Sequence, residues 1–137
     1  MKKILSGKWA AQYAGLSPFI LRIIFGYGIF LRGWMKLTTM HISGFSEMLG
    51  SLNIPLPMFF AGLVIWVEIL GGAALILGIF TRFAAKLLAI VMIVAILSVH
   101  IKNGFLGELG FEIPLLYLTG FISLMLTGAG KWSLESE

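Results

Sequence analysis

The stretch FFAGLVIWVEILGGAALILGIF, residues 59–80, is apolar throughout except for one carboxylate, Glu68. A helix needs about 20 predominantly apolar residues to cross the roughly 30 Å hydrocarbon core of a bilayer. The stretch therefore predicts a membrane-spanning helix. A charged side chain near the middle of such a helix costs at least about 2.5–3.5 kcal/mol, so Glu68 is expected to face the interior of a helix bundle and to have a partner there.

The composition of the whole chain is also that of a membrane protein. Of its 137 residues, 59% are hydrophobic and 12% are charged, whereas soluble domains carry about 25% charged residues. The basic residues lie at the ends of apolar runs and form no single patch, so the net charge of +4 does not predict nucleic-acid binding. The chain has no cysteine, so electrons in any redox reaction have to pass through a cofactor, a substrate or a partner subunit.

Three further apolar runs complete a predicted domain of four spans, residues 17–137. Pro18 and Pro114 each stand in the first turn of a run, where helices tolerate proline. The turn at residues 81–82 is tight, so the spans that flank it are expected to be antiparallel neighbours. The predicted fold class is all-α, a polytopic membrane protein with an antiparallel four-transmembrane-helix bundle. Its spans are expected at about residues 17–37, 57–80, 83–101 and 113–128.

Residues 1–16 are predicted to form a basic segment in the membrane interface. Their short apolar stretch is interrupted by Lys8, so cleavage as a signal peptide is not expected. Trp9 and Tyr13 are expected at the level of the lipid headgroups. Lysine and arginine are more numerous at the termini and around residues 81–82 than at the opposite ends of the spans. This bias predicts a multi-pass protein of the inner (plasma) membrane with both termini in the cytoplasm.

Ionisable residues from all four spans are expected to meet in the outer half of the bilayer. Arg32 and Lys36 lie four residues apart on one helix face, and we expect Arg32 to reach toward Glu68 while Lys36 stays nearer the surface. Arg32 and Lys36 are the candidate substrate-binding residues. Glu68, His100 and Glu112 are the candidate catalytic residues for proton transfer. The alternative is that these charges only pair with one another and hold the helices in register.

The types of residue in this cluster favour some ligands over others. Cations beside carboxylates suit an anion, a quinone carbonyl or a proton-transfer site, whereas Arg32 and Lys36 would repel a metal cation. Two histidines, of which His41 is expected in a loop, argue against a haem with two histidine ligands. The chain also lacks the GxGxxG, Walker and HExxH motifs. No metal or haem is therefore predicted, and a quinone is one of the ligands that the cluster suits.

Several blocks of the sequence resemble the DoxX family of small four-span membrane proteins. The blocks occur in the order LRIIFGYGIFLRGWMKL, NIPLPMFFAGLVIWVEILGGAALILGIFTR, VHIKNGF, GFEIPLLYL and GAGKWSLE, and they cover most of the chain. Relatives in this family include the small subunit of archaeal thiosulfate:quinone oxidoreductase. The resemblance implies an association with redox metabolism and quinones. It also implies that the family's motif positions are occupied here by Lys36, Glu68, Arg82, His100 and Glu112.

These observations predict a membrane subunit of a quinone-linked oxidoreductase, with a polar pocket in the outer half of the bundle and a soluble redox partner subunit. One alternative is a transporter module for a small anionic substrate or for protons. The other is a non-catalytic membrane anchor for a redox partner. Ala74 and Gly78 form a pair of small residues that permits close helix contact, either within the chain or in a homo-oligomer.

Overall fold

The apolar runs of the sequence fold into helices, and the all-α prediction is confirmed. The computed structural model describes residues 1–135, except for the side chain of Lys3, and these residues contain no strand. Of the short segments, η1 and η4 are 3-10 helices, and η2 and η3 are π-helical. In chain order the helices are α1 (Lys2–Leu5), η1 (Lys8–Leu16), α2 (Ser17–Met35), η2 (Lys36–Met40), α3 (His41–Ser51), α4 (Pro57–Leu77), α5 (Thr81–Ala95), η3 (Ile96–His100), η4 (Ile101–Asn103) and α6 (Glu112–Thr127).

Three continuous helical stretches have the length and apolar composition of membrane spans. They are Lys8–Ser51, Pro57–Leu77 and Thr81–Asn103. Many large apolar side chains on these helices are exposed, among them Trp66 and Leu70 of α4, and a bilayer would cover them. α6 is apolar as well, but its 16 residues are fewer than the number that a span normally needs. The fourth span, and with it the complete four-span bundle, stays a prediction.

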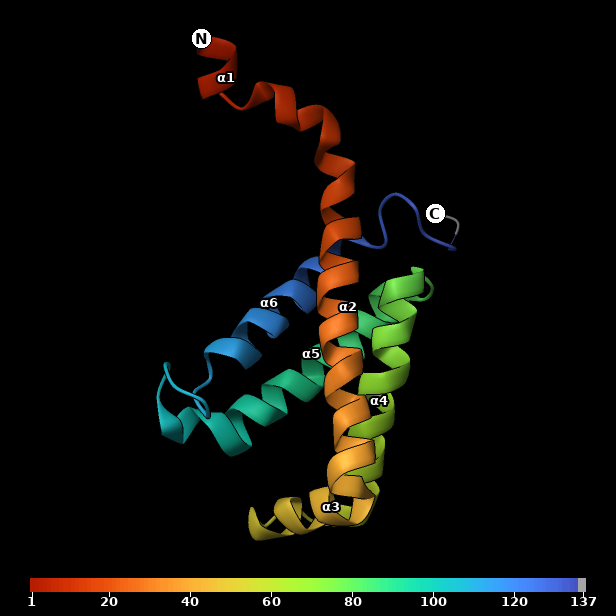
Figure 1. Ribbon diagram of the computed structural model, residues 1–137, viewed down its shortest axis with the longest axis vertical. Helices are drawn as coiled ribbons and strands as arrows, with labels where there is room; N and C mark the ends of the chain where they lie inside the picture. The colour runs from red at the N-terminus through yellow and green to blue at the C-terminus, as the bar shows by residue number, and fades with distance from the viewer. Residues whose placement is uncertain (136–137) are drawn as a thin grey trace.

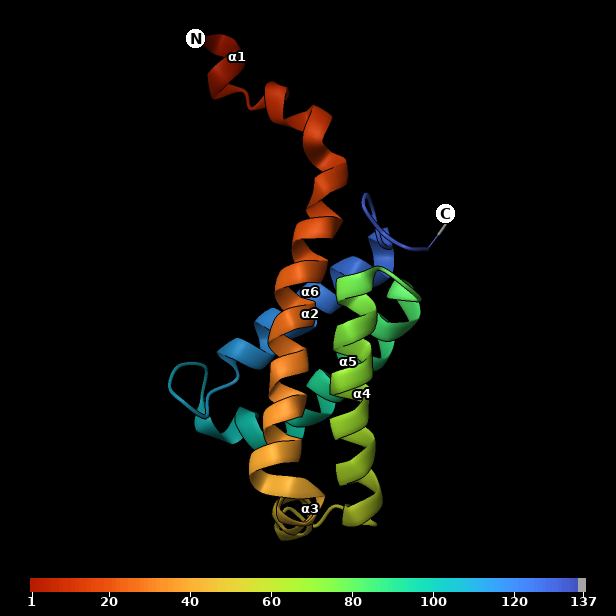
Figure 2. The ribbon, with the colours of Figure 1, turned by 45° about the vertical axis from the view of Figure 1, so that its right-hand side comes forward.

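The long helices form two pairs. α2 and α4 lie side by side and run in opposite directions in both views (Figures 1 and 2). α5 and α6 pack against each other and are inclined to the first pair (Figure 1). α3 crosses the end of the α2–α4 pair and contacts α4, while both chain termini lie toward the opposite end of the molecule.

Glycines allow α2 and α4 to approach closely. A Cβ atom on Gly72 would lie 2.7 Å from the carbonyl oxygen of Gly26 and 2.8 Å from the Cβ of Phe30. A Cβ on Gly33 would lie 2.9 Å from the Cβ of Glu68. Small residues at such contacts are typical of membrane helices, which associate by close van der Waals packing. This packing places Glu68 against the backbone of α2.

The hydrophobic core has two parts. One joins α2, α4, α5 and α6 around buried residues such as Ile29, Leu88 and Phe121. The other lies between α3 and α4 and includes Phe45 and Ile65.

Arg22 is completely buried and connects α2 to α4 and to the C-terminal segment, residues 128–135. Leu134 and Glu135 of this segment donate their backbone N–H groups to the carbonyls of Leu77 and Gly78, and the Glu135 carboxylate accepts from the N–H of Thr81. The segment therefore satisfies backbone groups where α4 ends and α5 begins. The guanidinium N–H groups of Arg22 donate hydrogen bonds of 2.8–3.3 Å to the carbonyl oxygens of Leu75, Ile76, Ala129, Lys131 and Trp132.

Candidate functional site

An ion pair between Lys36 and Glu68 forms the centre of the candidate site. The Lys36 Nζ lies 2.7 Å from Oε1 and 2.9 Å from Oε2 of Glu68. The Glu68 side chain is 1% exposed, whereas that of Lys36 is 27% exposed. Glu68 therefore faces the interior, and its charge is met by a charge from the neighbouring helical segment.

The partner of Glu68 differs from the one that the sequence predicts. Arg32 was expected to reach Glu68 and Lys36 to stay nearer the surface, but the hydrogen bonds to the carboxylate come from Lys36. The reason is the rotation of α2, because Gly33 is the residue that packs on Glu68. Lys36 follows Gly33 by almost one turn and lies on the same side, whereas Arg32 points about a quarter-turn away.

Arg32 instead lies over the ring of Tyr117 in α6. Its Cζ is 5.2 Å from the ring centroid, which is a cation–π distance. One turn earlier in α2, the hydroxyl of Tyr117 occupies the space that a Cβ on Gly28 would need. The side chain of Arg32 is exposed, and its positive charge still acts on Glu68. Through Tyr117, α6 becomes part of the site.

Phe45 of α3 closes the site on another side. The Nζ of Lys36 lies 5.1 Å from the centroid of the Phe45 ring, which is 5% exposed. The ammonium group is thus held by a carboxylate and by the face of an aromatic ring. Arg32, Lys36 and Glu68 together carry two positive charges and one negative charge, so this cluster has an excess of positive charge.

His100 takes part in a hydrogen-bonded loop between α5 and α6. Its Nδ1 donates to the carbonyl oxygen of Leu109 at 2.9 Å, and Asn103 donates to the same oxygen at 3.2 Å. The direction of the first bond follows from the carbonyl, which can only accept. His100 thereby holds the loop in place, and the structure records no contact between it and the Lys36–Glu68 pair.

Glu112 begins α6 and is half-buried. Its backbone N–H donates to the carbonyl of Phe105 at 3.1 Å. Its carboxylate forms no hydrogen bond or ion pair with any residue of the described chain. Of the five predicted site residues, the structure thus gathers Arg32, Lys36 and Glu68 and leaves His100 and Glu112 in the loop region, because α5 and α6 are inclined away from the α2–α4 pair (Figure 1).

Two aromatic residues of the site, Tyr117 and Phe45, were missed by the sequence reasoning. Gly28, one turn before Arg32, leaves room for another side chain to approach α2, but nothing in the sequence identifies that side chain as Tyr117. Phe45 belongs to the segment between the first two predicted spans, and its position depends on how α3 folds across the end of α4. Both contacts are tertiary, so local patterns could not predict them.

Arg82, a position that the family resemblance singled out, lies far along the chain from this cluster and has its own partners. Its guanidinium donates to the backbone carbonyls at the C-terminal end of α6, at 2.7 Å for Leu126 and 3.1 Å for Met125. Positive charge at a helix C-terminus is favourable because the unpaired carbonyls there carry partial negative charge. Arg82 therefore joins the start of α5 to the end of α6. Within residues 1–135 no group of three or more histidine, aspartate or glutamate side chains is arranged to hold a metal ion.

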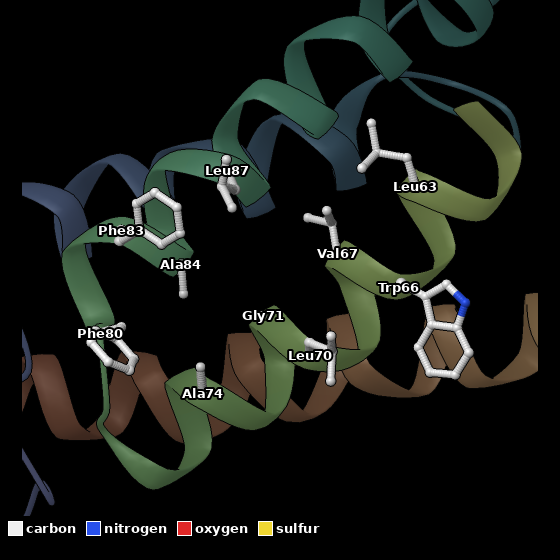
Figure 3. Close-up of a pocket in the computed structure, with 10 residues that line it drawn as sticks. All are labelled: Leu63, Trp66, Val67, Leu70, Gly71, Ala74, Phe80, Phe83, Ala84 and Leu87. Carbon is white, nitrogen blue, oxygen red and sulfur yellow. The ribbon is translucent and has the colours of Figure 1, made fainter. Parts of the chain in front are cut away.

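An open groove on α4 and α5 is separate from the polar cluster. It has a volume of about 440 Å³ and its lining contains no charged side chain. Figure 3 shows Gly71, Ala74 and Ala84 between the two helices, with Trp66 at one end and Phe80 at the other. Glu68 does not line this groove. The groove is therefore an apolar surface feature of α4 and α5, and the candidate site is the cluster around Lys36 and Glu68.

Comparison with known proteins identifies the family. The family model described as DoxX matches residues 17–101. "Putative oxidoreductase CatD" of Bacillus subtilis is 35% identical over 120 residues, which cover 88% of this chain and 85% of that protein. An uncharacterised protein of Haemophilus influenzae is 30% identical over 128 residues, covering 90% of this chain and 83% of its own length. An uncharacterised membrane protein of Mycobacterium tuberculosis is 39% identical over 95 residues, which are 61% of this chain and 58% of that protein.

No solved structure matches the chain. The family match and the relatives confirm the resemblance to the DoxX family that was predicted from the sequence blocks. The apolar helices agree with the membrane location of the family. This chain is a membrane protein and belongs to the DoxX family.

Proposed function

We propose that this protein is the membrane subunit of a quinone-linked oxidoreductase and that its quinone site lies around Arg32, Lys36 and Glu68. The observation that carries the proposal is the buried Lys36–Glu68 pair with a second cation beside it. An excess of positive charge among apolar helices favours an anionic or electron-rich ligand. The name of the Bacillus subtilis relative supports the reaction class.

The residues around the pair suit a quinone. Arg32 offers planar guanidinium N–H donors, which form strong hydrogen bonds with carbonyl oxygens or anions. Lys36 can turn one N–H of its ammonium toward a ligand while it keeps Glu68 as a partner. Tyr117 and Phe45 place ring faces beside these two cations, and the partly exposed Tyr117 offers aromatic surface to a flat ligand. The site thus combines charged donors with aromatic surface.

Quinone supplies the redox chemistry, since its reduction to quinol takes up two electrons and two protons. This chain has no cysteine, so the electrons come from a donor bound by a soluble partner subunit. Glu68 is the group that exchanges a proton at the site, and Lys36 stabilises its charged form. His100 and Glu112 carry protons between the aqueous boundary and the site in this proposal.

The membrane arrangement belongs to the same proposal. α6 serves as the fourth span of the bundle, and both termini lie in the cytoplasm of a cell whose inner membrane holds the protein. Figures 1 and 2 support this arrangement, because the N- and C-termini lie toward the same end of the molecule. The ion pair then lies nearer to the end where α3 crosses, in the outer half of the bilayer.

Quinone binding by the purified protein tests the proposal. A short-chain ubiquinone analogue is titrated into the protein in mild detergent, and lipid-soluble molecules that copurify with it are identified by mass spectrometry. We expect one saturable site, and an affinity at least about tenfold weaker for Glu68→Gln, since tenfold corresponds to about 1.4 kcal/mol, the scale of one charge-assisted hydrogen bond. Glu108→Gln, which changes an exposed loop carboxylate, is the control and should bind as the parent does.

Two outcomes would reject the quinone site. One is the absence of saturable binding, and the other is equal affinity for the parent protein and the Glu68→Gln variant when both are folded. Flux of a small anion into liposomes that contain only this protein would favour the transporter alternative, which uses the same cluster. Loss of thermal stability without any change in quinone binding would favour the anchor alternative.

A further inference from the structure

Residues 1–16 form an arm that leaves the body of the protein. η1 continues directly into α2, and both views show the arm extending past the other helices at the end where the C-terminus lies (Figures 1 and 2). Every described side chain from Met1 to Gly15 is exposed. The arm touches the body at its base, where the backbone N–H of Lys131 donates to the carbonyl of Gly15 at 3.4 Å.

Large apolar side chains are displayed along this arm. The exposed fractions are 73% for Ile4, 82% for Leu5, 60% for Trp9 and 53% for Tyr13. Trp9 and Tyr13 both belong to η1, a 3-10 helix with three residues per turn, and they project from it about a third of a turn apart. Exposed apolar side chains in a row mark a surface that something else covers.

The charge of the arm has one sign. Residues 1–16 contain three lysines and no acidic residue, and the first carboxylate in the chain is Glu47. The amino terminus adds a further positive group. At the base of the arm, exposed Lys131 adds another positive charge, and Trp132, which is 71% exposed, stacks edge-on against Phe19 at 4.9 Å. Basic and aromatic side chains therefore occur together at this end of the molecule.

The position at which the arm begins indicates which surface covers its apolar side chains. η1 is the N-terminal end of the membrane-length helical stretch Lys8–Ser51, so the arm leaves the body at the end where a bilayer crossed by that stretch would have its surface. A lipid surface is thus within reach of the arm in every copy of the protein. Lysine near an anionic leaflet gains about 1 kcal/mol, and tryptophan and tyrosine prefer the headgroup level. Gly7, with a φ of +65° and open space around it, joins α1 to η1 as a bend.

We propose that residues 1–16 bind the surface of an anionic phospholipid bilayer. Lys2 and Lys8 contact lipid phosphates, while Trp9 and Tyr13 enter the headgroup layer. Binding of this kind fixes the rotation and depth of α2 in the membrane, because η1 and α2 are continuous. The proposal concerns a different part of the chain from the Lys36–Glu68 site and does not depend on quinone binding.

Quenching of Trp9 by brominated lipids tests the proposal. The full-length protein is placed in nanodiscs of phosphatidylcholine alone, or of equal parts of phosphatidylcholine and phosphatidylglycerol, with bromine near the headgroup end of the acyl chains. The Trp9→Phe protein gives the background signal of the other tryptophans. We expect Trp9 to be quenched strongly in the anionic discs, weakly in the neutral discs, and weakly in anionic discs at high salt.

Two charge-matched double variants complete the test. Lys2→Gln with Lys8→Gln should lower the ratio of bound to free arm by about thirtyfold, the value that about 1 kcal/mol per lysine implies. Lys86→Gln with Lys102→Gln removes the same charge elsewhere and should leave the quenching of Trp9 unchanged. Equal quenching in neutral and anionic discs, or equal effects of the two double variants, would overturn the proposal. An arm that binds an acidic partner protein predicts no quenching in either disc, and that result would overturn it too.

Discussion

At the residue scale, the Lys36–Glu68 pair combines a high cost of burial with a close contact of opposite charges. Burying the Glu68 carboxylate and partly burying the Lys36 ammonium costs several kcal/mol, and the attraction between the two charges returns roughly that amount. The pair therefore adds little net stability, although each partner strongly needs the other. A structural role and a functional role of the pair can therefore be distinguished, because removing one charge and removing both charges have different effects on the free energy of unfolding and on ligand binding.

Substitution of the pair is the prediction at this scale. Glu68→Met leaves the Lys36 ammonium without its partner and should lower the free energy of unfolding by about 3–5 kcal/mol. The double variant Lys36→Met with Glu68→Met should recover most of this loss, because two apolar side chains of similar length fill the same space. Thermal unfolding in one detergent measures both. A double variant that is as unstable as the single one would show that the charges themselves stabilise the fold.

The same double variant also examines the proposed function. If it is stable but no longer binds the short-chain ubiquinone analogue, the pair is retained for binding. If it is stable and still binds the analogue as tightly as the parent, the pair is needed neither for folding nor for binding of the analogue.

At the element scale, Arg22 and the C-terminal segment make a joint between the end of α4 and the start of α5. α4 ends at Gly78, whose φ of +71° suits the left-handed conformation that often follows a helix. A Cβ at this position would lie 2.5 Å from the Nη1 of Arg22, so glycine also makes room for the guanidinium. Backbone groups at the end of a helix need partners, and Arg22 and the C-terminal segment supply them here.

Replacement of Arg22 is the prediction at this scale. Arg22→Met removes every hydrogen bond that the guanidinium donates to buried carbonyls, and each buried carbonyl left without a partner costs about 1–3 kcal/mol. We expect a loss of at least about 3 kcal/mol in the free energy of unfolding, together with faster hydrogen exchange of the Leu134 and Glu135 amides. Arg22→Lys should not rescue the fold, because an ammonium group lacks the planar set of donors.

Arg82→Met is the matched control for this prediction. Arg82 also donates to helix-end carbonyls, but it is exposed, so water can replace its hydrogen bonds. Its loss should cost about 1 kcal/mol or less. Equal destabilisation by the two variants would show that the burial of Arg22 does not explain its contribution to the free energy of unfolding.

At the scale of the whole molecule, the features that the sequence could predict are those that depend on local patterns. The apolar runs predicted helices, and the cost of a charge in such a run placed Glu68 in the interior. The choice of Lys36 over Arg32 depends on the rotation of α2 against α4, which is set by contacts of Gly33 that no local pattern contains. Likewise, the inclination of α5 and α6 separates His100 from the pair, and this inclination comes from tertiary packing.

The orientation of the molecule in the membrane is the last prediction. The N-terminal arm lies at one end of the protein, whereas α3 and the loop after α5 lie away from it (Figures 1 and 2). The lysines of residues 1–16 and the basic residues around position 82 should keep their end in the cytoplasm. Since the chain has no cysteine, single variants Gln12→Cys, Glu47→Cys and Lys102→Cys can each be labelled without background. In intact spheroplasts, a membrane-impermeant maleimide should label positions 47 and 102 and should label position 12 only after the membrane is opened. The reverse pattern would invert the topology and move the Lys36–Glu68 pair to the cytoplasmic half of the bilayer.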